Sequence, residues 1–153
     1  MVKSVLEIQH AILRTMSENT LDFHHIGVAT DNLEKAIDVY AHLGYQLQHQ
    51  EIYHDPIQQV NIVFVAKPGH PLVELISPAT ETSPIRAILK KMGATPYHSC
   101  FEVINIDMTI KFLREKRFVV ISKPVPAVAF NGRKVAFLFQ ANIGIIELLE
   151  AKI

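Results

Sequence analysis

The sequences PLVELI at residues 71–76 and IIELL at residues 145–149 each place a glutamate inside an otherwise apolar run. An ionised carboxylate in such a run costs free energy unless a cation or a hydrogen-bond donor pairs with it. Glu74 and Glu147 are separated along the chain by 147 − 74 = 73. His25 and His98 have the same offset, since 98 − 25 = 73. Two histidines and two glutamates repeated in register supply the donors of a divalent metal site between two similar halves.

A shift by this offset aligns the chain with itself without a gap, which indicates an internal repeat. Apolar positions and turns coincide as well: residues 32–33 fall on 105–106, Ile37 on Ile110, Tyr45 on Phe118, and IVFV at 62–65 on VAFL at 135–138. The chain is therefore predicted to contain two copies of one module within one domain.

Each copy has the pattern of a strand, a helix and three further strands. In the first copy, Asp31 or Asn32 can cap the helix, and Gly44 ends it in a left-handed conformation. The predicted strands are 25–30, 45–53, 60–66 and 72–77 in the first copy, and 97–103, 118–122, 133–139 and 144–150 in the second, whose helix spans 106–116. A connecting helix starts at Ser83-Pro84 and closes at Gly93.

We therefore expect an α+β fold in which two tandem βαβββ modules, residues 21–78 and 96–153, form a curved, barrel-like mixed sheet. A linker helix lies within residues 79–95, and residues 1–20 form an N-terminal helical extension. The sequence SVLE at residues 4–7 fits a capping box, with Val5, Ile8, Ile12 and Met16 on one helical face. That face is expected to pack against the sheet or a second subunit.

The composition excludes several classes of protein. The chain has 153 residues, is 49% hydrophobic and carries no net charge, which argues against disorder and against nucleic-acid binding. The single Cys100 rules out an internal disulfide and fits a reducing compartment. No apolar stretch approaches the roughly 18 residues of a membrane helix, and Glu7, His10 and Arg14 interrupt any secretory signal core. We expect a soluble, cytoplasmic protein with no membrane partner.

The repeated residues also have a structural interpretation. A single strand histidine is most often a hydrogen-bonded core or surface residue, and a single glutamate can face water on an antiparallel sheet. This interpretation requires four coincidences at one offset, so the metal site is favoured. Strand alternation places Cys100 on the face of His98, where it lines the pocket or is a small buried thiol, and points His24 to the other face in a supporting role. The turn NGRK at 131–134 either meets an anionic substrate tail or stays solvated.

Several motifs of this chain resemble those of the vicinal oxygen chelate superfamily, in its methylmalonyl-CoA epimerase and glyoxalase I branch. They are FHHIGVA at 23–29, LVELISP at 72–78, SPI at 83–85, YHSCFEV at 97–103, KPVP at 123–126, NGRKVAFL at 131–138 and IIEL at 145–148. The resemblance covers residues 23–150. It implies that His25, Glu74, His98 and Glu147 bind one divalent ion (Co, Ni, Zn, Mn or Fe) and that the protein is a homodimer.

The chain departs from that branch around the expected pocket. IQQV at 57–60 replaces EQGV, Phe139-Gln140 replaces His-Pro, the loop before Glu147 is shorter, and Tyr97-His98 replaces a pair of histidines. We expect Gln58, Cys100, Phe139 and Gln140 to line the substrate pocket. Because these loops differ, the CoA thioester is less firmly implied than the metal.

The resemblance and the donor set predict proton transfer next to a carbonyl or thioester, with an enolate stabilised by the metal. Glu147 is the expected base and Glu74 its partner, because an epimerase removes a proton from one face and returns it to the other. Three alternatives remain: a glyoxalase I-type lactoylglutathione lyase, a non-catalytic small-molecule-binding protein for resistance or sensing, and a ring-cleaving dioxygenase. The last usually needs an iron site of two histidines and one carboxylate, which Glu74 would crowd.

Overall fold

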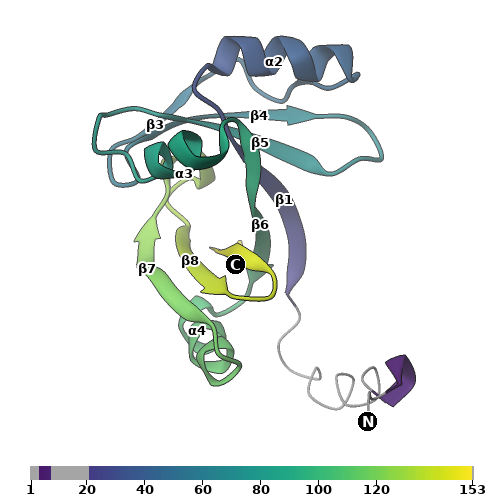
Figure 1. Ribbon diagram of the computed structural model, residues 1–153, viewed down its shortest axis with the longest axis vertical. Coiled ribbons are helices and arrows are strands. Elements are labelled where there is room, and N and C mark those ends of the chain that lie inside the picture. The colour runs from purple at the N-terminus through teal and green to yellow at the C-terminus, as the bar shows by residue number, and fades with distance from the viewer. Residues whose placement is uncertain (1–3, 8–20, 153) are drawn as a thin grey trace.

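The computed structural model describes residues 4–7 and 21–152. In this part of the chain, one mixed sheet of nine strands is combined with helices on its faces and ends (Figure 1). The elements are β1 Asp22–Ala29, α2 Leu33–His42, β2 Gln46–Leu47, β3 Tyr53–Asp55, β4 Val60–Ala66, β5 Leu72–Pro78, α3 Ile85–Met92, β6 Thr95–Val103, α4 Ile106–Glu115, β7 Val119–Pro126, the 3₁₀ helix η1 Val128–Phe130, β8 Lys134–Gln140 and β9 Gly144–Glu150.

The sheet runs in the order β2-β4-β5-β1-β6-β9-β8-β7, and β3 pairs with β4. The pairs β1/β5 and β6/β9 are parallel, and the other neighbours are antiparallel. The sheet curves strongly without closing on itself, and β1 and β6 join the two modules at its centre (Figure 1). The predicted α+β fold with a curved mixed sheet is confirmed, although the sheet is open rather than a barrel.

The offset found in the sequence reappears in the hydrogen-bonding register. Helix α2 begins at Leu33 and α4 at Ile106, and 106 − 33 = 73. In the parallel pairs, Gly27 lies opposite Glu74 and Cys100 opposite Glu147, which again have this offset. In the antiparallel pair β1/β6, His25 lies opposite Cys100 and Gly27 opposite His98, so the repeat maps this ladder onto itself. A pseudo-twofold axis therefore passes through the centre of the β1/β6 ladder.

The two equivalent helices begin with equivalent caps. The Asn32 side chain accepts a hydrogen bond from the Lys35 backbone N–H at 2.9 Å, and the Asn105 side chain accepts one from Met108 at 3.0 Å. Gly44 follows α2 with a φ of 85°, as the predicted left-handed cap requires. Helix α2 packs on β4 and β5, and α4 packs on β7, β8 and β9, at opposite ends of the molecule (Figure 1).

Strand alternation separates the helix-covered face from the face that carries the site. In β4 and β5, Val63, Val65, Val73 and Leu75 pack with α2, whereas Ile62, Phe64 and Ile76 belong to a separate central cluster. Glu74 lies between Val73 and Leu75 and therefore points away from α2, toward the central cluster. The alternation thus delivers the carboxylate to the concave side of the sheet.

Two strand predictions differ from the structure. The single strand predicted over 45–53 is two short strands, β2 and β3, with residues 48–52 outside both. Strand β7 extends to Pro126 instead of ending at residue 122, and its ladder with β8 shifts register at Ser122. Prolines at 124 and 126 are compatible with a strand here because β7 is at the end of the sheet and has no partner on its other side in the described part of the chain.

Asp55, at the end of β3, connects the two modules. Its buried carboxylate accepts hydrogen bonds from the backbone N–H groups of Ile57 and Gln58 at 3.0 and 2.9 Å, and from that of Val128 in η1 at 3.3 Å. These three backbone donors, together with the Gln58 side-chain amide at 3.1 Å, fix the turn between β3 and β4 against the opposite module.

The predicted capping box at the N-terminus is present. The Ser4 backbone N–H donates to the Glu7 carboxylate at 2.9 Å, and the Glu7 N–H donates to the Ser4 hydroxyl at 3.2 Å. The positions Ile8, Ile12 and Met16 of the predicted apolar face lie outside the described residues. No described helix is long and apolar enough to cross a membrane.

Candidate metal centre and pocket

Four buried polar side chains from four strands converge at the pseudo-twofold axis. His25 comes from β1, Glu74 from β5, His98 from β6 and Glu147 from β9, and none is more than 4% exposed. The His25 Nε2 atom lies 3.0 Å from Glu74 Oε2 and 3.2 Å from Glu147 Oε2. The His98 Nε2 atom lies 3.5 Å from Glu74 Oε2 and 3.2 Å from Glu147 Oε2, and the two Nε2 atoms are 3.4 Å apart. The structure thus brings together all four residues singled out in the sequence.

The strand register explains this convergence. Because β1 and β5 are parallel with Gly27 opposite Glu74, the side chains of His25 and Glu74 lie on the same face of the sheet. The same register places His98 and Glu147 on the equivalent face of β6 and β9. Gly27 lies opposite His98 across the antiparallel ladder, and a Cβ atom at this position would overlap the His98 imidazole. Glycine here makes room for the ring.

The donor atoms fit a divalent metal ion. Ligand atoms bound to one ion at roughly 2.0–2.2 Å stand about 3.0–3.5 Å from one another, the range that these four residues occupy. The buried Glu147 Oε2 atom has no hydrogen bond of acceptable geometry, although two ring nitrogens lie 3.2 Å from it. The Glu147 oxygen and the two ring nitrogens therefore point to a common position between them rather than form hydrogen bonds with one another. Two carboxylates would also balance the charge of a divalent ion.

Without a metal ion, the pKa values of these four groups are set by two opposing effects, burial and the contacts between the carboxylates and the imidazoles. Burial opposes a charge on His25, but the adjacent carboxylates of Glu74 and Glu147 outweigh burial and raise its pKa from 6.5 to about 10. The pKa of His98 is raised because the two carboxylates likewise outweigh burial. The pKa values of Glu74 and Glu147 are lowered, since their contacts with the histidines outweigh burial. A metal ion must therefore displace protons from the imidazoles.

Two equivalent phenylalanines hold the imidazole rings. Phe64 lies opposite Glu74 in the β4/β5 ladder and Phe137 opposite Glu147 in the β8/β9 ladder, and 137 − 64 = 73. The rings of Phe64 and His25 meet edge to face with centroids 5.9 Å apart, and those of Phe137 and His98 at 5.3 Å. Sequence reasoning missed both roles, although the alignment of IVFV with VAFL already paired the two positions.

His24 supports the site from behind. Its Nδ1 atom lies 2.8 Å from Nδ1 of His25, the ring nitrogen that faces away from the carboxylates. If His25 binds a metal through Nε2, its Nδ1–H donates a hydrogen bond to Nδ1 of His24. This bond fixes the tautomer and the ring orientation of His25. Burial, followed by the nearby His25, lowers the pKa of His24, so the neutral acceptor form is favoured.

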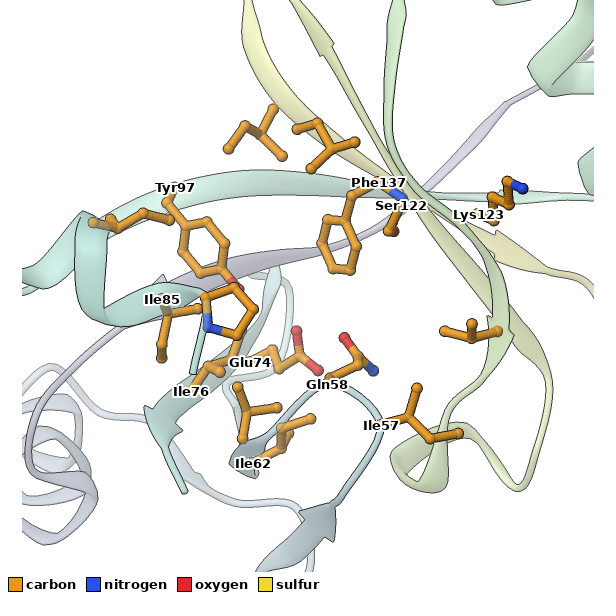
Figure 2. Close-up of a pocket in the computed structure, with 16 residues that line it drawn as sticks. Ile57, Gln58, Ile62, Glu74, Ile76, Ile85, Tyr97, Ser122, Lys123 and Phe137 are labelled. Carbon is orange, nitrogen blue, oxygen red and sulfur yellow. The ribbon is translucent and has the colours of Figure 1, made fainter. Parts of the chain in front are cut away.

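A cavity of about 620 Å³ opens beside Glu74 (Figure 2). Figure 2 shows Glu74 and Gln58 at its centre, with Tyr97 and Phe137 on one side and Ile62 and Ile76 on the other. Its lining is largely aliphatic and comes from both modules and the linker helix: Ile57, Gln58, Val60, Ile62, Glu74, Ile76, Pro84, Ile85, Ile88, Tyr97, Ile121, Ser122, Lys123, Val125, Phe137 and Ile145.

Of the four residues expected to line the pocket, only Gln58 does so. Cys100 is 0% exposed within the central cluster, and burial raises the pKa of its thiol, so the expectation of a small buried thiol holds instead. Phe139 lies further along β8, where it is 41% exposed, and the Gln140 side chain accepts a hydrogen bond from Asn142 N–H in the adjoining turn at 2.6 Å. Cys100, Phe139 and Gln140 were therefore wrongly predicted to line the pocket, because Cys100 is enclosed by core side chains and the other two lie at the end of β8 next to its turn.

The turn at 131–134 does not border this cavity either. The Arg133 guanidinium donates to the Glu102 carboxylate at 2.7 Å and to the Glu150 backbone carbonyl at 3.1 Å. It lines a separate cavity of about 200 Å³ that also includes His24 and Lys152. The Arg133 guanidinium is therefore paired with Glu102 and the Glu150 carbonyl, and it is not directed at the candidate substrate site.

Residues 24–137 match the family model described as the Glyoxalase/Bleomycin resistance protein/Dioxygenase superfamily. The chain belongs to this superfamily, which is the vicinal oxygen chelate superfamily of the sequence-based prediction. It is similar to the uncharacterised protein YqjC of Bacillus subtilis, with 32% identity over 88% of this chain and 94% of that protein.

Other relatives carry a named activity. The mitochondrial methylmalonyl-CoA epimerase of Bos taurus is 34% identical over 84% of this chain and 73% of that protein. The crystal structure of methylmalonyl-CoA epimerase from Mycobacterium tuberculosis superposes with a TM-score of 0.74 at 26% identity, covering 86% of this chain and 89% of that one. Homologues of this chain, in sequence and in fold, are therefore methylmalonyl-CoA epimerases.

Replacement of Gly27 by alanine tests the space reserved for His98. The added methyl group overlaps the ring, so we expect G27A to bind Co²⁺ more than about tenfold more weakly, as when a group that orients a metal ligand is lost. Isothermal titration calorimetry on protein stripped with a chelator measures this affinity. C100A, at the equivalent position of the second module, is the control and should bind like the wild type. Equal affinity of G27A and wild type would contradict the role of Gly27.

Removal of His24 tests its support of His25. H24L, which lacks an acceptor, should weaken Co²⁺ binding by about 10- to 100-fold. H24N places an amide oxygen near the position of the ring nitrogen and should restore affinity to within a few-fold of wild type. A purely space-filling role would make H24L the better of the two variants, which is the opposite ranking.

The pH dependence of stability tests the buried pairs. The pKa of His25 in the folded chain, about 10, lies above its ordinary value of 6.5, so its contribution to stability is complete below pH 6.5 and is lost as the pH rises through 10. The Tm of the stripped protein should therefore fall between pH 7 and pH 10, measured by circular dichroism. The stripped H25Q variant, the control, should show a smaller fall. A wild-type Tm that stays level over this range would rule out the raised pKa.

Proposed function

We propose that this protein is a metal-dependent epimerase that moves a proton on the carbon next to a thioester carbonyl. Its similarity to proteins named methylmalonyl-CoA epimerase supports this reaction class. The observation that carries the proposal is the pair Glu74 and Glu147, two carboxylates related by the pseudo-twofold axis and each within 3.5 Å of both imidazole Nε2 atoms. An epimerase needs a base on each side of the reacting carbon, and a pseudo-symmetric carboxylate pair supplies two.

The four side chains His25, Glu74, His98 and Glu147 would hold the divalent ion. A divalent ion held there would supply Lewis-acid polarisation of a carbonyl oxygen and would stabilise the negative charge that develops as the neighbouring C–H loses its proton. Glu147 removes the proton from one face of the carbon and passes it to solvent, and Glu74, after it takes a proton from solvent, returns that proton to the opposite face. Phe64 and Phe137 keep the imidazoles in place and exclude water from their edges.

The cavity agrees with a substrate that enters from the side of Glu74. Glu74 borders the cavity, and Glu147, which is 2% exposed, lies 3.2 Å from the two imidazole nitrogens that Glu74 also approaches. The reacting carbon would therefore lie at the inner end of the cavity, between the two carboxylates. Tyr97 also borders the cavity, and burial, followed by the nearby carboxylates, raises the pKa of its phenol well above 10. The phenol therefore stays protonated and can donate a hydrogen bond to a substrate oxygen.

The two bases can be tested separately in D₂O with the single stereoisomers of an α-branched acyl thioester, either methylmalonyl-CoA or 2-methylhexanoyl-CoA, whichever the wild type exchanges faster. E147Q and E74Q should each lose deuterium incorporation from one stereoisomer by at least about 100-fold, the usual effect of losing a general base. Mass spectrometry of the thioester measures the incorporation. Metal content is measured in parallel, because both residues are proposed ligands, and H98A serves as the control that lacks the metal. Incorporation by E147Q at the wild-type rate would refute the assignment of Glu147.

The glyoxalase I-type reaction uses the same stabilisation and is the alternative outcome. Turnover of the hemithioacetal of methylglyoxal and glutathione, without exchange in methylmalonyl-CoA, would favour that lyase. Purified protein that neither retains a metal nor exchanges deuterium would instead favour a binding module. The homodimer and the cytoplasmic location stay predictions from the sequence.

A further inference from the structure

We propose that the acyl chain accepted beside the metal centre is apolar and uncharged, rather than the chain of a dicarboxylic acid; this inference rests on the proposed function. It names a substrate class of α-branched aliphatic acyl thioesters. The charge of the site, the orientation of Gln58 and the aliphatic wall each support it.

The charge of the site disfavours another carboxylate. Glu74 and Glu147 already balance a divalent ion, so a carboxylate on the acyl chain would bring an uncompensated charge into a poorly solvated cavity. Among the residues that line the cavity in the described part of the chain, the one cation is Lys123. Lys123 is exposed on β7, and Figure 2 shows its ammonium group directed away from Glu74. Apart from the proposed divalent ion, whose charge the two glutamates balance and which must also stabilise the enolate, no cation of the described cavity wall faces the reacting centre.

Gln58 directs its amide oxygen toward the carboxylate of Glu74 (Figure 2). Its Nε2 group donates to the buried Asp55 Oδ2 atom at 3.1 Å, and an ionised carboxylate can only accept, which fixes the orientation of the amide. The carbonyl oxygen of Gln58 therefore lies next to the carboxylate of Glu74, and the second N–H of the amide takes no part in the bond to Asp55 (Figure 2). A substrate carboxylate between Gln58 Oε1 and the Glu74 carboxylate would meet two acceptors that repel it.

The remaining donors are neutral. The Ser122 hydroxyl accepts a hydrogen bond from the Phe137 backbone N–H at 3.0 Å, so its own proton is available to the cavity. The Tyr97 phenol is the second hydroxyl. Two hydroxyls suit a carbonyl oxygen, but they supply no positive charge for a carboxylate.

The rest of the wall is aliphatic and β-branched, and it includes Ile62, Ile76, Ile85, Ile88 and Ile145. Such side chains have few rotamers, so the wall keeps its shape without a ligand. A cavity of about 620 Å³ is in the range of sites that enclose small organic ligands. Each methylene that enters should improve binding by roughly fourfold until the cavity is filled.

Matched unreactive ligands separate chain polarity from chemistry. We would measure the affinity of the Co²⁺-loaded protein for S-butyl-CoA, S-hexyl-CoA and S-octyl-CoA, and for S-(5-carboxypentyl)-CoA, which differs from S-hexyl-CoA by a terminal carboxylate. Affinity should rise with chain length, and S-hexyl-CoA should bind more than about tenfold better than its carboxylated counterpart. Equal or tighter binding of the carboxylated ligand would overturn the inference.

A variant tests whether the lack of a cationic side chain at the cavity wall causes the preference for S-hexyl-CoA over its carboxylated counterpart. Ile121 lines the cavity yet is 55% exposed, so I121R can add a cation at the wall without burying it. I121R should reduce the preference for S-hexyl-CoA by at least about tenfold, because the carboxylate gains a partner. V119R, on the same strand and 62% exposed but outside the cavity lining, is the matched control and should keep the wild-type preference. The same preference in I121R as in wild type would contradict the inference.

The exchange assay distinguishes the two levels of failure. If methylmalonyl-CoA exchanges deuterium faster than 2-methylhexanoyl-CoA and the carboxylated ligand binds as well as S-hexyl-CoA, the apolar substrate class is wrong and the epimerase proposal stands. If no thioester exchanges and no CoA ligand binds, both are wrong. Exchange into 2-methylhexanoyl-CoA with tight S-hexyl-CoA binding supports both.

Discussion

Burial of two carboxylates against two imidazoles places the strongest demand on this fold. Glu74 and Glu147 are almost completely excluded from water, and an unpaired carboxylate in such surroundings is not tolerated. The chain meets this requirement by pairing β1 with β6 at the centre of the sheet, so that each glutamate contacts both histidines. Small residues beside the rings, Gly27 and Cys100, provide the space.

The pseudo-twofold symmetry and the cavity serve different parts of the proposed reaction. The symmetric elements are the four polar residues, the two phenylalanines and the parallel pairs β1/β5 and β6/β9, and they define a centre with a carboxylate on either side. The cavity is asymmetric, because Gln58 from the first module faces Ser122 from the second. The symmetric carboxylates thus support proton transfer at two faces of a carbon atom. The cavity does not follow the pseudo-twofold symmetry, so a substrate can bind from one side only.

Asp55 shows how that asymmetry is maintained. Its carboxylate holds the turn before β4, the amide of Gln58 and the start of η1 in the other module. No apolar run surrounds Asp55 in the sequence, and an aspartate before a proline is common in turns. Its burial and its contact with Val128 therefore could not be anticipated from local pattern. The same holds for β7, which continues beyond the predicted end at residue 122 because its edge position permits Pro124 and Pro126.

Sequence patterns were sufficient to predict the repeat, a cap at Asp31 or Asn32, the α+β order of each module and the four polar residues at the pseudo-twofold axis. These features follow from periodicity and from charges in apolar runs, which are local or repeat at one offset. The folded molecule was needed to show which side chains line the cavity, that Cys100 is buried and Phe139 turns outward, and which way the Gln58 amide points. Those properties depend on sheet curvature and on contacts between modules, and neither leaves a periodic signal in the chain.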